Sequence, residues 1–397
     1  MKLLGLPLAV LAATTVAAAG SRKGHQDVLV PQAETLGSGL TPFQLKEQGF
    51  RLISTSATKA PEWLTEADIL GLYQSDTKFI DVTDGDLESV AGLAPPRRFA
   101  IPAKPVHQAV VNPLLAKISM TETKKWLTEF TSFKTRYFKS QSGKESAEWL
   151  YTQLKTLTAK ADPSKLKITI QKFTHDWPQP SILLRIESSK TPSNQHLPTV
   201  ILSAHQDSVN KNDPMNGRSP GADDDGSGSA TIFETLRVLI TSSFLPHNPL
   251  EFHWYSAEEG GLLGSQKVVS EYRRRDADVV GVFHADMTGF QAAGKEEVVA
   301  MAGDNVDDEL QAFTRGLVEV YNPGVKIIES SCGYGCSDHA SWTNAGYPAA
   351  FTFENSFQET GGYAHSEEDT VEHITFEHVR KFTRTALAFA VELSYSK

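Results

Sequence analysis

The stretch Gly221–Ala230, GADDDGSGSA, sets three consecutive aspartates between glycines and runs directly into an apolar, helix-like segment at residues 231–240. Three adjacent carboxylates repel one another unless water, a helix dipole or cations compensate their charge. One interpretation is a helix start, because Asp and Ser cap the free N–H groups of a first turn. The other interpretation is a cation site, and the sequence on either side of the stretch bears on the choice.

Helix-like and strand-like segments alternate from about Asn112 onward. Ser119–Glu122 and Ser142–Glu145 have the pattern of capping boxes, and the first precedes aromatic residues that we expect on one helical face as far as Tyr137. Strands are expected at residues 166–173, 199–203, 250–255, 279–283, 298–301 and 349–353. This alternation predicts a three-layer α/β/α sandwich around a mixed, mainly parallel central sheet.

Charged residues follow three of the expected strands. His205 follows the expected strand at 199–203, Glu258 and Glu259 follow the one at 250–255, and Asp286 follows the one at 279–283. Each could be a helix cap or a surface turn on its own. Ligands of α/β sheets bind at the carboxyl ends of the strands, however, and imidazole with carboxylate is a ligand set that suits zinc. Together with the three aspartates, these residues predict a metal site.

Composition limits the possible partners and the cellular compartment. The chain has 397 residues and a net charge of −10, which argues against nucleic acid or an anionic membrane as its partner,. Residues 1–19 have the pattern of a cleaved signal peptide, with a membrane anchor as the alternative, so we expect a secreted, extracellular protein. In that oxidising setting Cys332 and Cys336 should form a disulfide,.

Residues 20–98 differ from the rest of the chain in lacking a long periodic element, and they end at Pro95-Pro96-Arg97-Arg98. The dibasic pair suggests proteolytic processing, and an ordinary N-terminal subdomain is the alternative. We therefore expect a boundary between about residues 80 and 98, with a separate N-terminal segment at 20–98 and the main domain at 99–397.

Longer sequence blocks from about Asn112 to the C-terminus resemble the co-catalytic dizinc exopeptidases, in particular the secreted bacterial and fungal leucine aminopeptidases. The blocks are HQDS at 205–208, SPGADDDGSGSA at 219–230, SAEEGGLLGSQ at 256–266, ADMTG at 285–289, CGYGCSDHASWTNAGYPAA at 332–350, and Ala364-His365-Ser366 with Asp369-Thr370. Their order and spacing also agree with the family.

The resemblance implies a ligand set for two zinc ions. Asp224 would bridge the two ions, with Glu259 sharing the first ion with His205. Asp286 and His365 would complete the second set. Asp207 would hydrogen-bond the imidazole of His205 and fix its tautomer. Asp223 and Asp225 would then be caps or supporting acceptors.

The resemblance also implies the reaction. Glu258 would act as general base for attack by a metal-bridging water, releasing leucine and other apolar residues from free peptide N-termini. Met287, Tyr334, Phe351 and Phe357 are candidates for the pocket of the first side chain. The family is made as proenzymes, so residues 20–98, ending between about 80 and 98, would be a pro-segment that acts as an intramolecular inhibitor and folding aid. Residues 99–397 would be the catalytic domain, and the processed enzyme would be a monomer.

Other functions found on the same fold are those of a carboxypeptidase, a glutaminyl cyclase, a dipeptidase and a receptor that has lost its metal ligands. A carboxypeptidase should carry a basic group for the carboxylate of its substrate, and a cyclase commonly works with one zinc. An inactive receptor is disfavoured because all five ligands and the base are present,.

Overall fold

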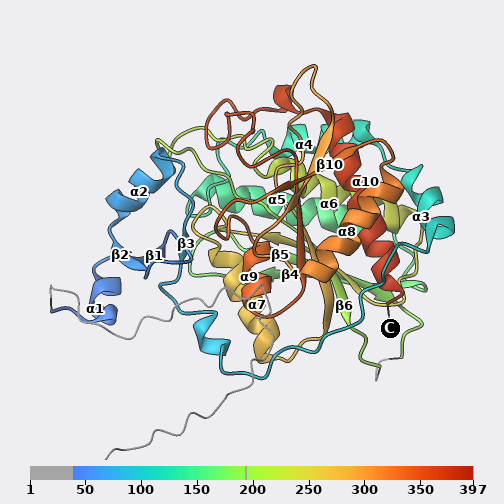
Figure 1. Ribbon diagram of the computed structural model, residues 1–397, viewed down its shortest axis with the longest axis horizontal. Helices are drawn as coiled ribbons and strands as arrows, with labels where there is room; N and C mark the ends of the chain where they lie inside the picture. Colours follow the sequence, from blue (N-terminus) through green and yellow to red (C-terminus); the bar gives the residue numbers. More distant parts are fainter. Residues whose placement is uncertain (1–38, 193–194, 397) are drawn as a thin grey trace, which may run out of the picture.

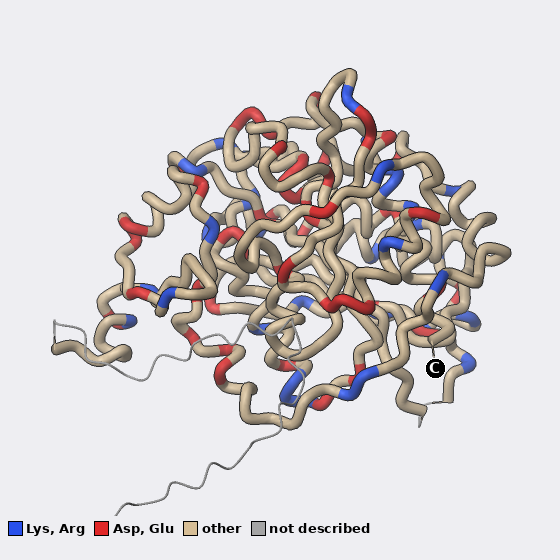
Figure 2. Tube along the Cα trace, viewed as in Figure 1, with Lys and Arg blue, Asp and Glu red and all other residues tan. Residues whose placement is uncertain are grey.

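The computed structural model describes residues 39–192 and 195–396 (Figure 1). The expected signal peptide, residues 1–19, lies outside the described residues. Among the helices that are described, none combines the length and the apolar character needed to cross a bilayer. Basic and acidic residues are interspersed along the trace (Figure 2).

Eight strands of the described chain form one mixed sheet in the order β10-β9-β11-β8-β6-β7-β5-β4. The four central strands, β11, β8, β6 and β7, run parallel, while β5 and β4 add antiparallel strands at one edge. The strands are β4 (Leu166–Phe173), β5 (Ser181–Ser188), β6 (Thr199–His205), β7 (Leu250–Tyr255), β8 (Val279–Ala285), β9 (Val298–Ala302), β10 (Lys326–Ser330) and β11 (Ala349–Phe353).

Helices cover both faces of this sheet, so the predicted three-layer sandwich is confirmed (Figure 1). One face packs on α3 (Gln108–Leu115), α4 (Met120–Phe130), α5 (Gln141–Thr158), α6 (Gly226–Thr241), α8 (Asp308–Tyr321) and α10 (Phe376–Ser394). The other face packs on α7 (Leu263–Arg274) and α9 (His339–Asn344). A short 3₁₀ helix, η2 (Val371–His373), precedes α10. The central strands β6, β7 and β8 are buried along their whole length, which explains their continuous apolar character,.

All six predicted strands are present. The sequence did not predict β5 or β10. β5 carries Arg185 and Glu187 within its run, and β10 begins with Lys326 at the sheet edge, where its burial is partial. Charged residues on half-exposed strands weaken the apolar pattern from which a strand is predicted.

Two helix boundaries differ from the prediction. α4 ends at Phe130, and residues up to Tyr137 form a loop, because the Thr131 hydroxyl donates to the carbonyl of Leu127 and helps to close the last turn,. α5 begins two residues earlier than expected, with Ser140 as its cap; its Oγ accepts from the Gly143 amide at 2.8 Å.

Residues 39–98 form an N-terminal segment beside the sandwich, drawn in shades from blue to cyan in Figure 1. It consists of α1 (Pro42–Glu47), β1 (Arg51–Ser54), β2 (Glu62–Leu64), α2 (Glu66–Gln74), β3 (Ile80–Asp81) and the 3₁₀ helix η1 (Glu88–Val90), with the strands in the order β2-β1-β3. Its apolar side chains pack with Tyr137, Phe138 and Leu263 of the larger part. Whether a protease removes this N-terminal segment stays a prediction.

The buried face of α8 provides a test of the core. We expect Leu317→Ala, at a fully buried position, to lower the free energy of unfolding by about 2–5 kcal/mol,. The matched control is Val320→Ala on the same helix, where the side chain is 42% exposed and the change should stay within about 0.5 kcal/mol,. Urea unfolding followed by circular dichroism measures both. Equal losses for the two variants would contradict the described packing.

Candidate metal centre

The charged residues predicted from the sequence meet at the carboxyl ends of the central strands. His205 is the last residue of β6, Asp286 directly follows β8, and Glu258 and Glu259 come shortly after β7. β6 lies between β7 and β8 and runs parallel to both, so the carboxyl ends of the three strands are adjacent. Asp224 reaches the same place from the loop before α6.

Asp224 joins two clusters of side chains that could hold metal ions. Its Oδ1 lies 3.1 Å from Nε2 of His205, and its Oδ2 lies 3.1 Å from Nε2 of His365. Asp286 completes the first cluster, with Oδ1 3.6 Å from Nε2 of His205. Glu259 completes the second, with Oε2 3.1 Å from Nε2 of His365. In each cluster the three ligand atoms lie within 4.8 Å of one another.

The pairing of residues within the clusters differs from the expectation. We expected Glu259 beside His205, and the structure places Glu259 with His365 and Asp286 with His205. His205 and Asp286 end two adjacent strands. Glu259 instead follows a sharp turn after β7, where Ala257 has a φ of 60°. The five residues are those predicted, and their roles as ligands stay a prediction.

The donor atoms of both clusters fit a divalent cation. Nε2 of His205, Nε2 of His365, Oε1 of Glu259 and Oδ1 of Asp286 are buried and make no hydrogen bond of acceptable geometry among the described residues, although oxygens of Asp224 lie 3.1 Å from both nitrogens. An unpartnered buried polar atom costs about 1–3 kcal/mol, so four of them in one place call for a ligand. Imidazole nitrogen and carboxylate oxygen are zinc donors.

The surrounding carboxylates also determine the charge of the two imidazoles. Burial by itself lowers the pKa of His205, but the charge of Asp286 and the contact with Asp207 outweigh burial and hold that pKa well above its usual range. At His365 the carboxylates of Glu259 and Asp224 outweigh burial in the same way and raise the pKa. Protons and metal ions therefore compete for these nitrogens.

Asp225 is a helix cap that also connects three loops. Its Oδ1 accepts from the amide of Gly228 at 2.8 Å, which caps α6, and from the amide of Met287 at 3.2 Å. Its Oδ2 accepts from the amide of His205 at 3.1 Å. Both interpretations of the aspartate run therefore apply, because Asp225 caps the helix and Asp224 belongs to both candidate metal clusters.

Asp369 fixes the backbone of the aspartate run and had been given no role from the sequence. Its carboxylate accepts from the amides of Asp223 at 2.8 Å and Asp224 at 3.0 Å. Its carbonyl accepts from the amide of Ala222 at 3.1 Å. Because Asp369 stands four residues after His365, it joins the loops of two ligands in the second cluster. Its presence in a family block was the only signal in the sequence.

Arg136 is a fully buried arginine that sequence reasoning missed. Its guanidinium donates to the carbonyls of Gln206 at 2.8 Å and Gly221 at 2.9 Å, and also to that of Pro220. It thereby holds the loop after β6 against the loop before α6. Gly221 has a φ of +54°, and a Cβ there would lie 2.5 Å from the Asp224 carbonyl oxygen, so only glycine fits,.

Asp207 supports the site in a different way from the one predicted. Its Oδ1 lies 3.6 Å from Nδ1 of His205, which is too long for a hydrogen bond,. The carboxylate instead accepts from the amides of Glu258 at 3.1 Å and Glu259 at 3.2 Å. Asp207 therefore holds the turn that carries both glutamates, while keeping the imidazole of His205 within electrostatic reach.

Glu258 and Glu259 point to different surroundings although they are adjacent. Glu259 belongs to the second cluster. Glu258 belongs to neither cluster, and it lines a cavity of about 340 Å³. Burial raises the pKa of Glu258 well above its usual range, and the charges of Glu259 and Asp286 add to the effect. A raised pKa suits a group that has to accept a proton and release it again.

The same cavity has an apolar wall. Met287, Phe351 and Phe357 line it, as predicted for the first side-chain pocket, together with Phe353 and the disulfide Cys332–Cys336. The disulfide confirms the pairing expected from the sequence. Tyr334 does not line this cavity, because its ring packs with Ile80, Val82 and Leu262 at the boundary with the N-terminal segment.

Three other histidines near the family blocks lie outside the two clusters. His253 pairs with the Tyr255 hydroxyl at 2.9 Å and with Glu251 at 3.0 Å. His284 pairs with the hydroxyls of two serines, and His339 stacks on the ring of Phe351 at 4.4 Å between centroids. These contacts give the three histidines structural roles.

The N-terminal segment reaches the 340 Å³ cavity through the loop between α2 and β3. Asp76 lies 2.7 Å from Nζ of Lys211 and 3.6 Å from Nδ1 of His365. The contact with His365, and then that with Lys211, lowers the pKa of Asp76 to about 2. Lys78 lines the cavity beside Glu258. Neither Asp76 nor Lys78 had been predicted, because both lie outside the family blocks in the sequence.

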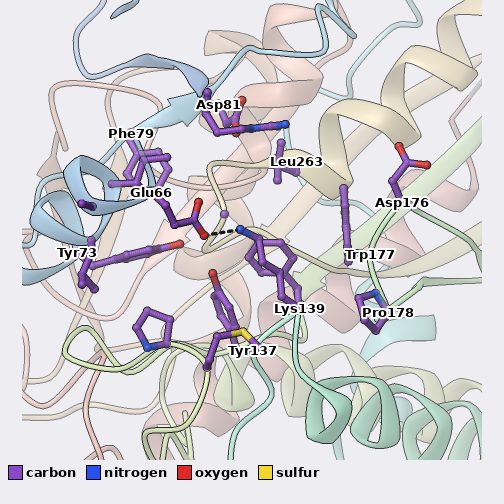
Figure 3. A pocket seen from close by; sticks show the side chains of 18 of the residues that line it. Glu66, Tyr73, Phe79, Asp81, Tyr137, Lys139, Asp176, Trp177, Pro178 and Leu263 are labelled. Atoms are coloured by element: carbon purple, nitrogen blue, oxygen red, sulfur yellow. Dashed lines mark hydrogen bonds and ion pairs between the residues drawn. The ribbon is translucent and has the colours of Figure 1, made fainter. Parts of the chain in front are cut away.

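A larger cavity of about 630 Å³ lies between the N-terminal segment and the sandwich (Figure 3). Tyr73 and Phe79 line it from the segment, and Tyr137, Trp177 and Leu263 line it from the larger part. It contains none of the five candidate ligands, so the smaller cavity beside Glu258 is the one in which chemistry is expected.

Comparison with known proteins agrees with these observations. Residues 183–390 match the model of peptidase family M28. The chain is 42% identical to leucine aminopeptidase 1 of Chaetomium globosum, over 84% of this chain and 83% of that protein. It is 37% identical to leucine aminopeptidase 1 of Pyrenophora teres f. teres over the full length of both. The LapA aminopeptidase of Legionella pneumophila superimposes with a TM-score of 0.73 at 28% identity, covering 87% of this chain and 93% of that one.

The role of Asp207 can be tested through metal affinity. We expect Asp207→Asn to weaken zinc binding about 10- to 100-fold, because the turn bearing Glu259 loses a charged acceptor. Asp213→Asn, at an exposed position in the loop after β6, is the matched control and should bind like the wild type. Competition against a chelator of known zinc affinity measures both variants. Unchanged affinity in Asp207→Asn would rule out this supporting role.

Proposed function

The chain belongs to peptidase family M28, and we propose that it is a zinc aminopeptidase that releases leucine and other apolar residues from peptide N-termini. The observation that carries the proposal is the sharing of Asp224 between two clusters that each contain one imidazole and a second carboxylate. The names of its fungal relatives support the reaction and the preference for leucine.

The proposal includes two zinc ions per chain. His205 and Asp286 would hold one ion, Glu259 and His365 the other, and Asp224 would contribute one oxygen to each. When bound, zinc lowers the pKa of a bound water and polarises a carbonyl group. The orphaned donor atoms in both clusters support a count of two.

Glu258 is the general base in this proposal. It lies in the cavity beside the clusters without belonging to either, so its carboxylate is free to accept a proton from the attacking water. It then passes that proton to the leaving amine, which departs neutral. The raised pKa of Glu258 favours both transfers near neutral pH.

The apolar wall of the cavity would select the first side chain. Burying a branched apolar side chain against Met287, Phe351 and Phe357 is worth about 1.5–3 kcal/mol,. Such a wall offers a charged side chain no partner, so we propose a preference for leucine and similar residues. Tyr334 is left out of this pocket because it packs elsewhere.

We further propose that residues 20–98 are a pro-segment that inhibits the enzyme until a protease removes it, and that the protein is secreted as a proenzyme and acts as a monomer. Asp76 and Lys78 at the mouth of the cavity support inhibition, because they stand where a substrate would enter. The hydroxyl of Tyr73 also donates to the carbonyl of Glu259 at 2.6 Å, which ties the segment to the ligand loop.

The base can be tested with an isosteric variant. We expect Glu258→Gln to lower kcat on leucinamide by about 10²- to 10⁴-fold, because the amide cannot accept the proton. Elemental analysis should still find about two zinc ions per chain, since Glu258 is not a ligand in this proposal. Glu271→Gln, at an exposed position on α7, is the control and should keep full activity. Activity without zinc, or a fully active Glu258→Gln, would refute the mechanism.

Inhibition by the N-terminal segment can be tested on the full-length chain. We expect limited proteolysis between residues 80 and 98 to raise the rate on leucinamide, because cleavage frees the mouth of the cavity. Uncleaved Lys78→Met should be more active than the uncleaved wild type, since it removes a charge that faces the catalytic carboxylates. Lys59→Met, exposed in the same segment, should match the wild type. An uncleaved wild-type chain as active as the cleaved one would disprove inhibition.

A further inference from the structure

Lys211 is the one ammonium group that the sandwich itself contributes to the lining of the 340 Å³ cavity, within the described residues. The other charged side chains that residues 99–396 contribute there are the candidate ligands Asp224, Asp286 and His365 and the proposed base Glu258. Lys211 has no part in the mechanism described above. An ammonium group in the lining of a cavity that is otherwise rich in carboxylates calls for an explanation.

The loop after β6 holds Lys211 in place. Its amide donates to the carbonyl of His365 at 2.9 Å, so its position is tied to the loop of a candidate ligand. The neighbouring Asn210 side chain accepts from the amides of Asn212 and Asp213 and donates to the carbonyl of Arg218. The Lys211 side chain keeps 29% exposure, so solvent reaches it and it is not part of the core.

In this structure a carboxylate occupies the position next to Lys211. Asp76 of the N-terminal segment places one oxygen 2.7 Å from Nζ of Lys211, and its other oxygen lies 3.6 Å from Nδ1 of His365. Two residues further on, Lys78 presents an ammonium group to the same cavity. The segment therefore offers one carboxylate and one ammonium group, which are also the two charges of a short peptide.

Lys211 and the apolar wall are connected to different candidate clusters. Met287 begins the apolar wall directly after Asp286 of the first cluster, whereas Lys211 is tied to His365 of the second cluster. Met287 is thus attached to the first cluster and Lys211 to the second, and the two clusters share Asp224. In a dipeptide the terminal carboxyl carbon lies within about 4 Å of the scissile carbonyl carbon, so a carboxylate beyond the scissile bond stays close to the clusters.

We propose that Lys211 determines specificity by binding a substrate carboxylate on the leaving side of the scissile bond, once Asp76 has vacated that position. The carboxylate is the C-terminus of a dipeptide or the side chain of an acidic second residue. This inference rests on the proposed aminopeptidase function and on release of the N-terminal segment, and it adds a preference for short or acidic peptides. The guanidinium of arginine could replace the ammonium, but an uncharged side chain could not.

Three leucyl substrates test the inference with the purified chain in the form that hydrolyses leucinamide, full-length or proteolysed. Leu-Gly carries a terminal carboxylate, Leu-Gly-NH₂ carries none, and Leu-Asp-NH₂ carries one only on its side chain. We expect the wild type to have a lower KM for Leu-Gly or Leu-Asp-NH₂ than for Leu-Gly-NH₂. The substrate that gains identifies the source of the carboxylate. In Lys211→Met that advantage should fall about tenfold, and Lys211→Arg should restore most of it.

The controls separate this inference from the function on which it rests. Lys295→Met changes an exposed lysine outside the cavity and should keep the wild-type ratios of KM. The urea midpoint of each variant reports whether it has folded, and Lys211→Gln provides a second neutral variant. Equal KM values for the three substrates in the wild type, or unchanged ratios in Lys211→Met, would overturn the role of Lys211. Failure of the wild type to release leucine from any substrate would instead overturn the proposed function.

Discussion

Repulsion among buried carboxylates is the constraint on which the rest of this structure depends. Asp224, Glu259 and Asp286 are withdrawn from water at one edge of the sheet, with Glu258 beside them. Burying so much like charge is prohibitive unless cations compensate it. Two imidazoles and the guanidinium of one buried arginine supply part of that compensation. The metal ions in our proposal would supply the remainder, which is why the clusters present donor atoms without partners.

The same charge is used to hold the loops in place. Asp207, Asp225 and Asp369 each accept two or more backbone amides from other loops, and a carboxylate is stabilised by such donors,. The strands β6, β7 and β8 are buried and rigidly paired, so the loops begin from fixed points. The clusters owe their spacing to this combination of a rigid sheet and charged acceptors between loops.

The charges of the N-terminal segment match those of the cavity that it helps to line. Whatever occupies the mouth has to bring positive charge toward the carboxylates and negative charge toward Lys211. Lys78 and Asp76 do both from one short loop. The inhibitory segment and the short peptide substrate of our proposals are therefore subject to the same electrostatic requirement.

The sequence by itself determined the sandwich and the six main strands, because buried parallel strands are apolar throughout. Charged residues stand out where those strands end, which marked His205, Glu259 and Asp286, whereas Asp224 and His365 were assigned as ligands through the family resemblance. The disulfide followed from the presence of only two cysteines. Only the tertiary structure decided that Glu259 joins His365, that Asp207 holds amides, and that Tyr334 packs outside the cavity. It also decided the contacts of Asp76, Arg136 and Lys211. Each of these depends on loops that are distant in the chain and are brought together by the sheet, and local sequence patterns carry no record of such distances.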